Sequence, residues 1–268
     1  MPAELVAAAA AVGLDVVAIT DHDTTAGWEA ALAARPDGLT ILRGTEFSCV
    51  HHGDVGRPVN LHLLGYLYDP AAEALRAERA HLRAGRSERG QRIVELLEAD
   101  DYPITWPQVQ RIAGGGVVGR PHVGRALVES GVVASVDEAF AGLISSKSPY
   151  YVRKANLDVF DALRLIRAAG GVTVFAHPLA SRRGPIVADD VIAAMAAAGL
   201  DGIEVDHADH DGDARRHAAG LADDLDLVKT GSSDYHGTNK TLALGSCTTD
   251  PEQYERLIDR PTALRPVG

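Results

Sequence analysis

Short apolar runs alternate with longer amphipathic stretches at both ends of the chain. Runs of strand length occur at residues 15–20, 40–48, 59–66, 172–176, 202–205 and 227–231. Helices are expected over residues 2–12, 26–34, 156–169, 187–198, 211–224 and 251–258, and Asn156 is a suitable N-cap for the third of these. Strands that alternate with helices predict an α/β fold built on a parallel sheet or barrel, here with six strands.

This alternation stops between Tyr66 and Gly170, where no run resembles a core strand. Residues 71–101 are charged and helical in character, and shorter helical segments follow at 106–113, 121–129 and 136–143. So long a stretch is not a loop. The sequence therefore predicts an inserted helical cap subdomain at residues 69–156, with the barrel formed by residues 1–68 and 157–268.

Composition narrows the classes of function. The 268 residues carry a net charge of −11, which argues against a broad nucleic-acid surface, since such a surface needs basic side chains. A nucleotide substrate stays open, because metal ions supply positive charge locally. Cys49 and Cys247 lie in no paired motif and are expected as free thiols. No apolar run approaches ~20 residues and no signal peptide is recognisable, so we expect a cytoplasmic protein without a membrane span.

The candidate chemistry lies where the predicted strands end, because histidines stand there beside carboxylates. Imidazole and carboxylate together favour Zn, Mn or Fe over Mg or Ca. In α/β barrels and sheets, ligands gather beyond the carboxyl ends of the strands, so scattered residues can form one site. The residues concerned are His22, Glu46, His62, His177, His207, Asp234 and His236.

Taken singly, several of these residues have ordinary explanations. A lone histidine in an apolar strand, such as His62, is more often a hydrogen-bonded core residue than a ligand. Glu46 is equally consistent with a surface carboxylate. Arg120 and His122 open a helix after a glycine run, where they either cap the helix or clamp a phosphate. Five further histidines are expected at solvated positions: His51, His52, His81, His210 and His217.

In this order the segments resemble the PHP (polymerase and histidinol phosphatase) family, and within it the small bacterial metal-dependent phosphoesterases. The matching stretches are AITDHDTTAG (18–27), GTE (44–46), HLLGY (62–66), GRPH (119–122), GGVTVFAHP (170–178), GIEV (202–205) and SSDYHG (232–237). The resemblance implies a distorted seven-stranded β/α barrel with two or three divalent metals at its mouth. It also implies hydrolysis of a phosphate mono- or diester of a nucleotide or short oligonucleotide.

The resemblance further implies six metal ligands and three substrate-binding residues. Glu46 would bridge two metals, and His62 and His177 would complete the second metal site around it. The other implied ligands are Asp234 for the first site and His22 and His236 for the third; the implied substrate-binding residues are Arg120, His122 and His207.

One segment of the family pattern has no counterpart here. The family begins with a strand ending in His-x-His and a Ser-Asp-Gly segment, whereas here Met1 directly precedes the first predicted helix. By that pattern the first metal site lacks two ligands and the third lacks one, so fewer metals are expected. Three explanations stay open: a start placed too far downstream, a degraded family member, or another group that fills the gap.

Hydrolysis of a phosphate ester by metal-activated water is the leading hypothesis. One alternative is a catalytically impaired remnant that only binds a nucleotide or metal. Another is an amidohydrolase-like enzyme acting on a C–N bond, which the GRPH segment and the lack of a lysine at a strand end disfavour. The oligomeric state is left open by the sequence.

Overall fold

The computed structural model describes residues 2–53, 58–154, 156–237 and 242–268. The chain divides into two compact units, the first of Met1–Arg79 with Asn156–Gly268 and the second of Ala80–Ala155. Helix α3 (Glu73–Ala99) begins in the first unit and continues in the second, so this division falls later than the boundary expected at residue 69. That the helical segment caps the barrel mouth stays a prediction.

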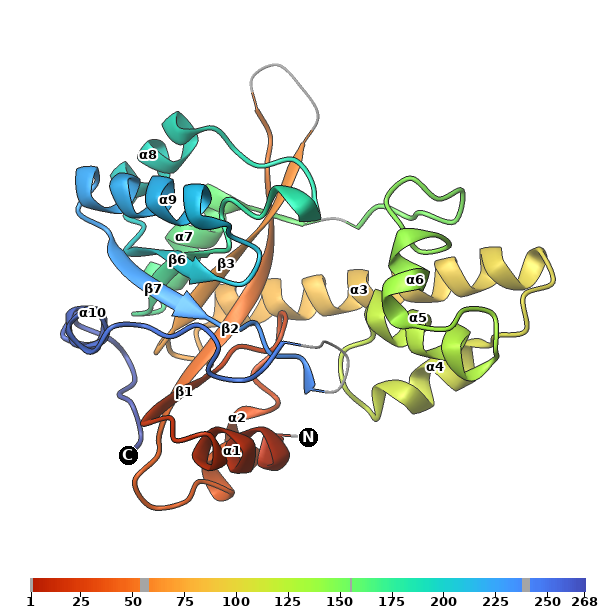
Figure 1. Ribbon diagram of the computed structural model, residues 1–268, viewed down its shortest axis with the longest axis horizontal. Helices are drawn as coiled ribbons and strands as arrows, with labels where there is room; N and C mark the ends of the chain where they lie inside the picture. The colour runs from red at the N-terminus through yellow and green to blue at the C-terminus, as the bar shows by residue number, and fades with distance from the viewer. Residues whose placement is uncertain (1, 54–57, 155, 238–241) are drawn as a thin grey trace. The chain divides into compact units, whose positions relative to one another are not determined.

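A curled mixed sheet forms the centre of the first unit (Figure 1). Across the sheet the strands follow the order β1 (Val16–Ile19), β2 (Thr40–His51), β3 (Val59–Tyr66), β5 (Val172–Ala176), β6 (Gly202–His207) and β7 (Val228–Ser232). A seventh strand, β4 (Leu157–Asp158), pairs with β2 outside this order. The α/β class is confirmed, but the count of six was wrong because a two-residue strand carries no hydrophobic pattern.

Strand β3 runs antiparallel to both of its neighbours, whereas the other pairs in the sheet are parallel. The prediction of a parallel sheet or barrel was therefore wrong at this strand. Antiparallel strands need no helical crossover, and no helix separates β2 from β3 in the described part of that connection. Because β3 is reversed, the early position of His62 in it lies opposite Ser48 and Ala176, near the carboxyl ends of β2 and β5.

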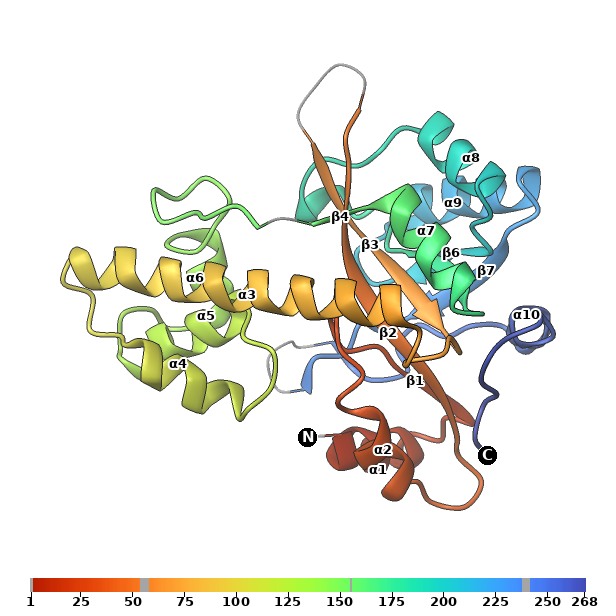
Figure 2. The same ribbon diagram turned by 180° about the vertical axis from the view of Figure 1, so that it is seen from behind.

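Several helices of the first unit pack against the sheet. Helix α7 (Val159–Ala168) lies along β2, β3 and β5 (Figure 2), while α9 (Gly212–Asp224) contacts β6 and β7, and α10 (Pro251–Ile258) contacts β7. The described part of this unit also contains α1 (Pro2–Ala11), α2 (Trp28–Ala33), α8 (Asp189–Ala197) and the short 3-10 turn Ser181–Arg183. The expected N-cap Asn156 was wrong: the cap of α7 is Asp158, whose carboxylate accepts the backbone N–H groups of Phe160 and Asp161.

The second unit has an apolar core of its own. The later part of α3 packs with α4 (Trp106–Ala113), α5 (Arg120–Glu129) and α6 (Val136–Ala141) around fully buried Leu97, Val109, Val123 and Leu127. Within the described ranges, no helix has the length and apolar character needed to cross a membrane. Cys49 and Cys247 form no disulfide, as expected, and both are buried.

Candidate metal centre

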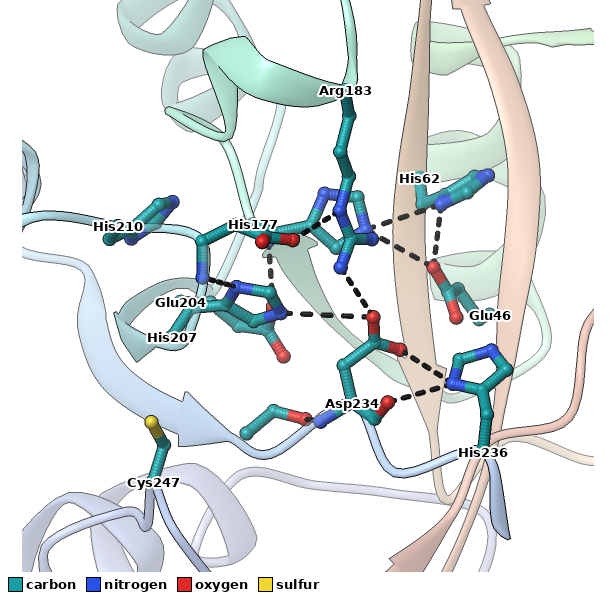
Figure 3. A network of polar contacts seen from close by, with 12 residues as sticks. Glu46, His62, His177, Arg183, Glu204, His207, His210, Asp234, His236 and Cys247 are labelled. Atoms are coloured by element: carbon teal, nitrogen blue, oxygen red, sulfur yellow. Dashed lines mark hydrogen bonds and ion pairs between the residues drawn. The ribbon is translucent and has the colours of Figure 1, made fainter. Parts of the chain in front are cut away.

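The carboxylate of Glu46 faces the rings of His62 and His177 (Figure 3). Its Oε1 is 2.6 Å from His62 Nδ1 and 3.3 Å from His177 Nε2, and those two nitrogens are 3.2 Å apart. Its Oε2 is 3.7 Å from His22 Nδ1. The two carboxylate oxygens therefore face different histidines, which is the arrangement needed to bridge two cations.

The protonation states of this cluster suit a cation. Burial raises the pKa of Glu46, but the charges of His22 and His62, together with hydrogen bonds from His177 and His62, outweigh it and hold the pKa well below its usual value. Burial lowers the pKa of His177. An ionised carboxylate and a neutral imidazole are the forms that metals bind, so the shifts of Glu46 and His177 both favour a cation.

The spacing of the donor atoms also fits a metal. Ligand atoms bound at ~2.1 Å to a tetrahedral metal lie ~3.4 Å apart. The two distances from His177 Nε2 are close to this value, and only the short contact between Glu46 and His62 has to open. His22, Glu46 and His62 also offer ligand atoms that all lie within 4.8 Å of one another.

The turn after β1 holds His22 beside Glu46. Asp23 is fully buried with φ of +57°, and its carboxylate accepts the backbone N–H and the hydroxyl of Ser48 on β2. Backbone bonds from Glu46 N–H to Thr20 and from Asp23 N–H to Glu46 complete the attachment. Asp23, one of the two carboxylates that flank His22 in the sequence, therefore positions the turn that holds His22.

His236 is oriented as a ligand through its other nitrogen. Its Nδ1 lies 2.7 Å from the backbone oxygen of Asp234, and a carbonyl only accepts, so Nδ1 carries the proton. This leaves the Nε2 lone pair for a cation, which is the usual arrangement of a metal-binding histidine. The ring centroids of His22 and His236 are 6.4 Å apart.

The Asp234 carboxylate is bound by an arginine that sequence reasoning missed. Arg183 Nη2 donates to Asp234 Oδ2 and Arg183 Nε to Asp209 Oδ2, each over 2.5 Å. Burial alone would lower the pKa of Arg183, but the two carboxylates outweigh it and raise the pKa. A guanidinium therefore lies where the resemblance places a metal.

His207 and His210 have different roles although they are three residues apart. His207 is fully buried; its Nδ1 accepts the N–H of Asp209, so Nε2 carries the proton. No described residue accepts from that Nε2–H, and Asp234 Oδ2 lies 4.0 Å away. Burial and then the charges of His177 and Arg183 lower the pKa of His207 to about 4. His207 is thus a neutral hydrogen-bond donor rather than a metal ligand.

The expectation that His210 is solvated was wrong. The side chain is buried; Nδ1 lies 3.0 Å from the Val205 carbonyl, and Nε2 accepts the N–H of Leu179. With both ring nitrogens bonded to the backbone, His210 ties two loops together and has no lone pair left for a metal.

A second acidic residue, Glu204 of β6, is buried beside His177. The register with β7 shifts between Glu204 and Asp206, so Glu204 and His207 are both buried instead of alternating. Glu204 Oε2 accepts the backbone N–H of His177 over 2.6 Å. His177 itself has φ of +32°, an uncommon conformation for a residue with a side chain.

Arg120 and His122 lie in the second unit at the start of α5. Arg120 packs over the Phe140 ring with its guanidinium carbon 5.2 Å from the ring centroid, and its Nη1 donates to the Ile144 carbonyl. His122 Nδ1 accepts the Gly119 N–H, which leaves a proton on Nε2. Burial, then the charges of Arg125 and Arg86, lower the pKa of His122.

Two proteins of named activity are similar over most of the chain. A 3',5'-nucleoside bisphosphate phosphatase from Chromobacterium violaceum is 34% identical over 237 residues, which cover 88% of this chain and 81% of the phosphatase. A 5'-3' exoribonuclease from Haemophilus influenzae is 31% identical over 245 residues, 91% of this chain and 87% of the exoribonuclease. The chain belongs to this family of phosphoesterases. No family model matches it.

Solved structures agree with this assignment. A structure described as a metal-dependent phosphoesterase from Bifidobacterium adolescentis has a TM-score of 0.91 and 38% identity, and the match covers 97% of this chain and 91% of that one. The predicted class, a metal-dependent phosphoesterase, is thereby confirmed.

Another solved structure with this fold is described as a different class of enzyme. A structure described as an amidohydrolase from Chromobacterium violaceum, with sulfate and no metal, has a TM-score of 0.81 and 31% identity, covering 96% of this chain and 91% of that one. The fold therefore does not itself separate C–N from phosphate ester hydrolysis. The relatives that are named as a phosphatase and an exoribonuclease favour phosphate ester hydrolysis.

Proposed function

We propose that this chain is a member of the PHP family that hydrolyses phosphate mono- or diesters of nucleotides or short oligonucleotides. The observation that carries the proposal is the convergence of Glu46 Oε1, His62 Nδ1 and His177 Nε2 within 3.3 Å of one another. Mn, Zn or Fe suits this mixture of imidazole and carboxylate. His22 and His236 are the donors proposed for a further cation.

Individual residues of the chain would then have different roles in the reaction. A metal held by Glu46, His62 and His177 would supply the positive charge that activates water and neutralises phosphate oxygens. Glu46 keeps the donors together through both of its oxygens. The buried Nε2–H of His207 offers a hydrogen bond to an oxygen entering the space beside Asp234. Such preorganised donors gain strength where water is excluded.

Arg120 and His122 remain the proposed phosphate-binding residues. A guanidinium and a neutral imidazole N–H are both donors that suit a phosphate oxygen. The nearby Arg86 and Arg125 charges add to the positive potential around His122, since they lower its pKa. This cluster of cations supports an anionic ligand, and the relatives named for bisphosphate and RNA hydrolysis make a nucleotide the expected class.

The test is phosphate release and chain shortening with two probes, adenosine 3',5'-bisphosphate and a short 5'-phosphorylated RNA. We expect turnover with added Mn²⁺, loss after chelation, and recovery when the metal is restored. Glu46→Gln should lower the rate at least roughly a hundredfold, since even residues that merely orient metal ligands cost 10–100-fold. Glu29→Gln, at an exposed site in the same unit, is the matched control.

The outcome also separates the alternatives. Metal binding at Glu46 without turnover of either probe would favour the catalytically impaired remnant. Turnover that chelation and Glu46→Gln both leave unchanged would contradict the proposed centre.

A further inference from the structure

Arg183 connects three loops at the carboxyl ends of β5, β6 and β7 (Figure 3). It lies in the 3-10 turn Ser181–Arg183, which follows β5, while Asp209 follows β6 and Asp234 follows β7. Its Nε and Nη2 donate to these two carboxylates over 2.5 Å each. Charge-assisted contacts of this kind, made by two nitrogens of one planar group, are among the stronger hydrogen bonds in proteins.

The same carboxylate oxygen would serve a metal at Asp234. The Asp234 side chain is 10% exposed, so its lone pairs are directed largely inside the protein. A divalent cation and the guanidinium would compete for Oδ2 and would also repel each other at contact distance. Because two carboxylates face one guanidinium, the group keeps a net negative charge, and the position still attracts a cation.

The Glu46 position differs in this respect. Its partners are the imidazoles of His22, His62 and His177, and neutral imidazole is itself a metal ligand. Arg183 has no lone pair to offer a metal at any pH that a folded protein meets. The carboxylate of Glu46 therefore lies among groups that can bind a metal, whereas the carboxylate of Asp234 is bound by a cation that would compete with a metal.

We propose that Arg183 competes with a divalent cation for Asp234, so that a cation there binds more weakly than the cation at Glu46. The inference rests on the proposed metal centre. Asp209 holds Arg183 Nε independently of Asp234. A cation that displaces Nη2 from Asp234 therefore leaves the arginine tethered beside the site, and the arginine returns when the cation leaves. Occupancy at Asp234 thus depends on the free metal concentration, over a range in which Glu46 is already filled.

The test is a Mn²⁺ titration of the chelator-treated full chain by calorimetry. The wild type should show a tighter and a weaker class of sites. Arg183→Gln should tighten the weaker class by roughly tenfold or more, which corresponds to about 1.4 kcal/mol. Arg183→Lys should give a smaller gain, because lysine keeps the charge but not the two-point contact. Arg182→Gln, at the exposed neighbouring position, should leave both classes unchanged.

The double variant Arg183→Gln with Asp234→Asn assigns the gain, since it should lose the tightening if Asp234 is the ligand. A weaker class that Arg183→Gln leaves unchanged or weakens would overturn the proposal, as would a gain that survives Asp234→Asn. Arg183→Lys keeps the test available if Arg183→Gln proves unstable. Glu46→Gln examines the metal centre separately: a tight class that survives it contradicts the proposed function, whereas the comparison at Asp234 still reports on Arg183.

Discussion

Glu204 should make the metal-free protein less stable as the pH rises, and Glu204→Gln should remove that dependence. The side chain is 3% exposed and its carboxylate accepts the His177 N–H. Burial, helped by the charges of Glu46 and Asp234, raises the pKa of Glu204 from 4.5 to about 8. In the unfolded chain this carboxyl has its ordinary pKa, so the proton is bound more tightly in the folded state.

The sign and the magnitude follow from this difference. Between pH 4.5 and about 8 the folded protein holds a proton that the unfolded chain has released, so the free energy of unfolding falls as the pH rises. This contribution to the free energy of unfolding is fully present below pH 4.5 and is lost progressively as the pH rises through about 8. At ~1.4 kcal/mol for each pH unit, the whole interval corresponds to about 5 kcal/mol. Gln keeps the acceptor oxygen but cannot ionise. The free energy of unfolding of Glu204→Gln should therefore not show this fall with rising pH.

The assay is urea unfolding with chelator present at several pH values from about 5 to about 8. The free energy of unfolding of the wild type should fall relative to that of Glu204→Gln, while Glu29→Gln should follow the wild type. Groups distant from Glu204 also titrate in this interval, but they cancel in the difference between the two proteins. Parallel curves for wild type and Glu204→Gln would refute the buried, protonated carboxyl.

Three further changes test other parts of the structure. Gly202→Ala should lower the melting temperature, because a Cβ there would lie 2.8 Å from the Val228 carbonyl oxygen, whereas Gly220→Ala, with nothing within 4 Å, should not lower it. His210→Ala should lower the melting temperature yet leave Mn²⁺ binding unchanged, since both ring nitrogens are bonded to the backbone. Arg120→Ala should weaken inorganic phosphate binding by about 1.5–3 kcal/mol in calorimetry, and unchanged affinity would count against the clamp.

Much of the fold was predictable because its signals are local. Helices α4 and α10 have the predicted bounds, and each begins after a side-chain cap, Thr105 or Asp250, with proline in its first turn. The reversal of β3 and the pairing of β4 were not predictable in this way. They depend on which distant strand lies alongside, and a short apolar run has the same pattern in either direction.

The site was predictable as far as its residues follow strands. Arg183 gave no such signal, because Arg182 beside it is chemically identical and the difference is made by Asp209 and Asp234 on two other loops. Glu204 gave no signal of its own, because a carboxylate in a strand is equally consistent with a surface position, and its role depends on the backbone N–H of His177 after another strand. His210 lies in a polar segment and is buried only because two loops meet around it.

The most direct test of the account is anomalous X-ray scattering from crystals of the Mn²⁺-loaded protein. The metal centre predicts a strong peak ~2.0–2.2 Å from Glu46 Oε1, His62 Nδ1 and His177 Nε2, with weaker density beside Asp234 at low metal concentration. A metal bound elsewhere, or full occupancy at Asp234 with the Glu46 position empty, would contradict the account.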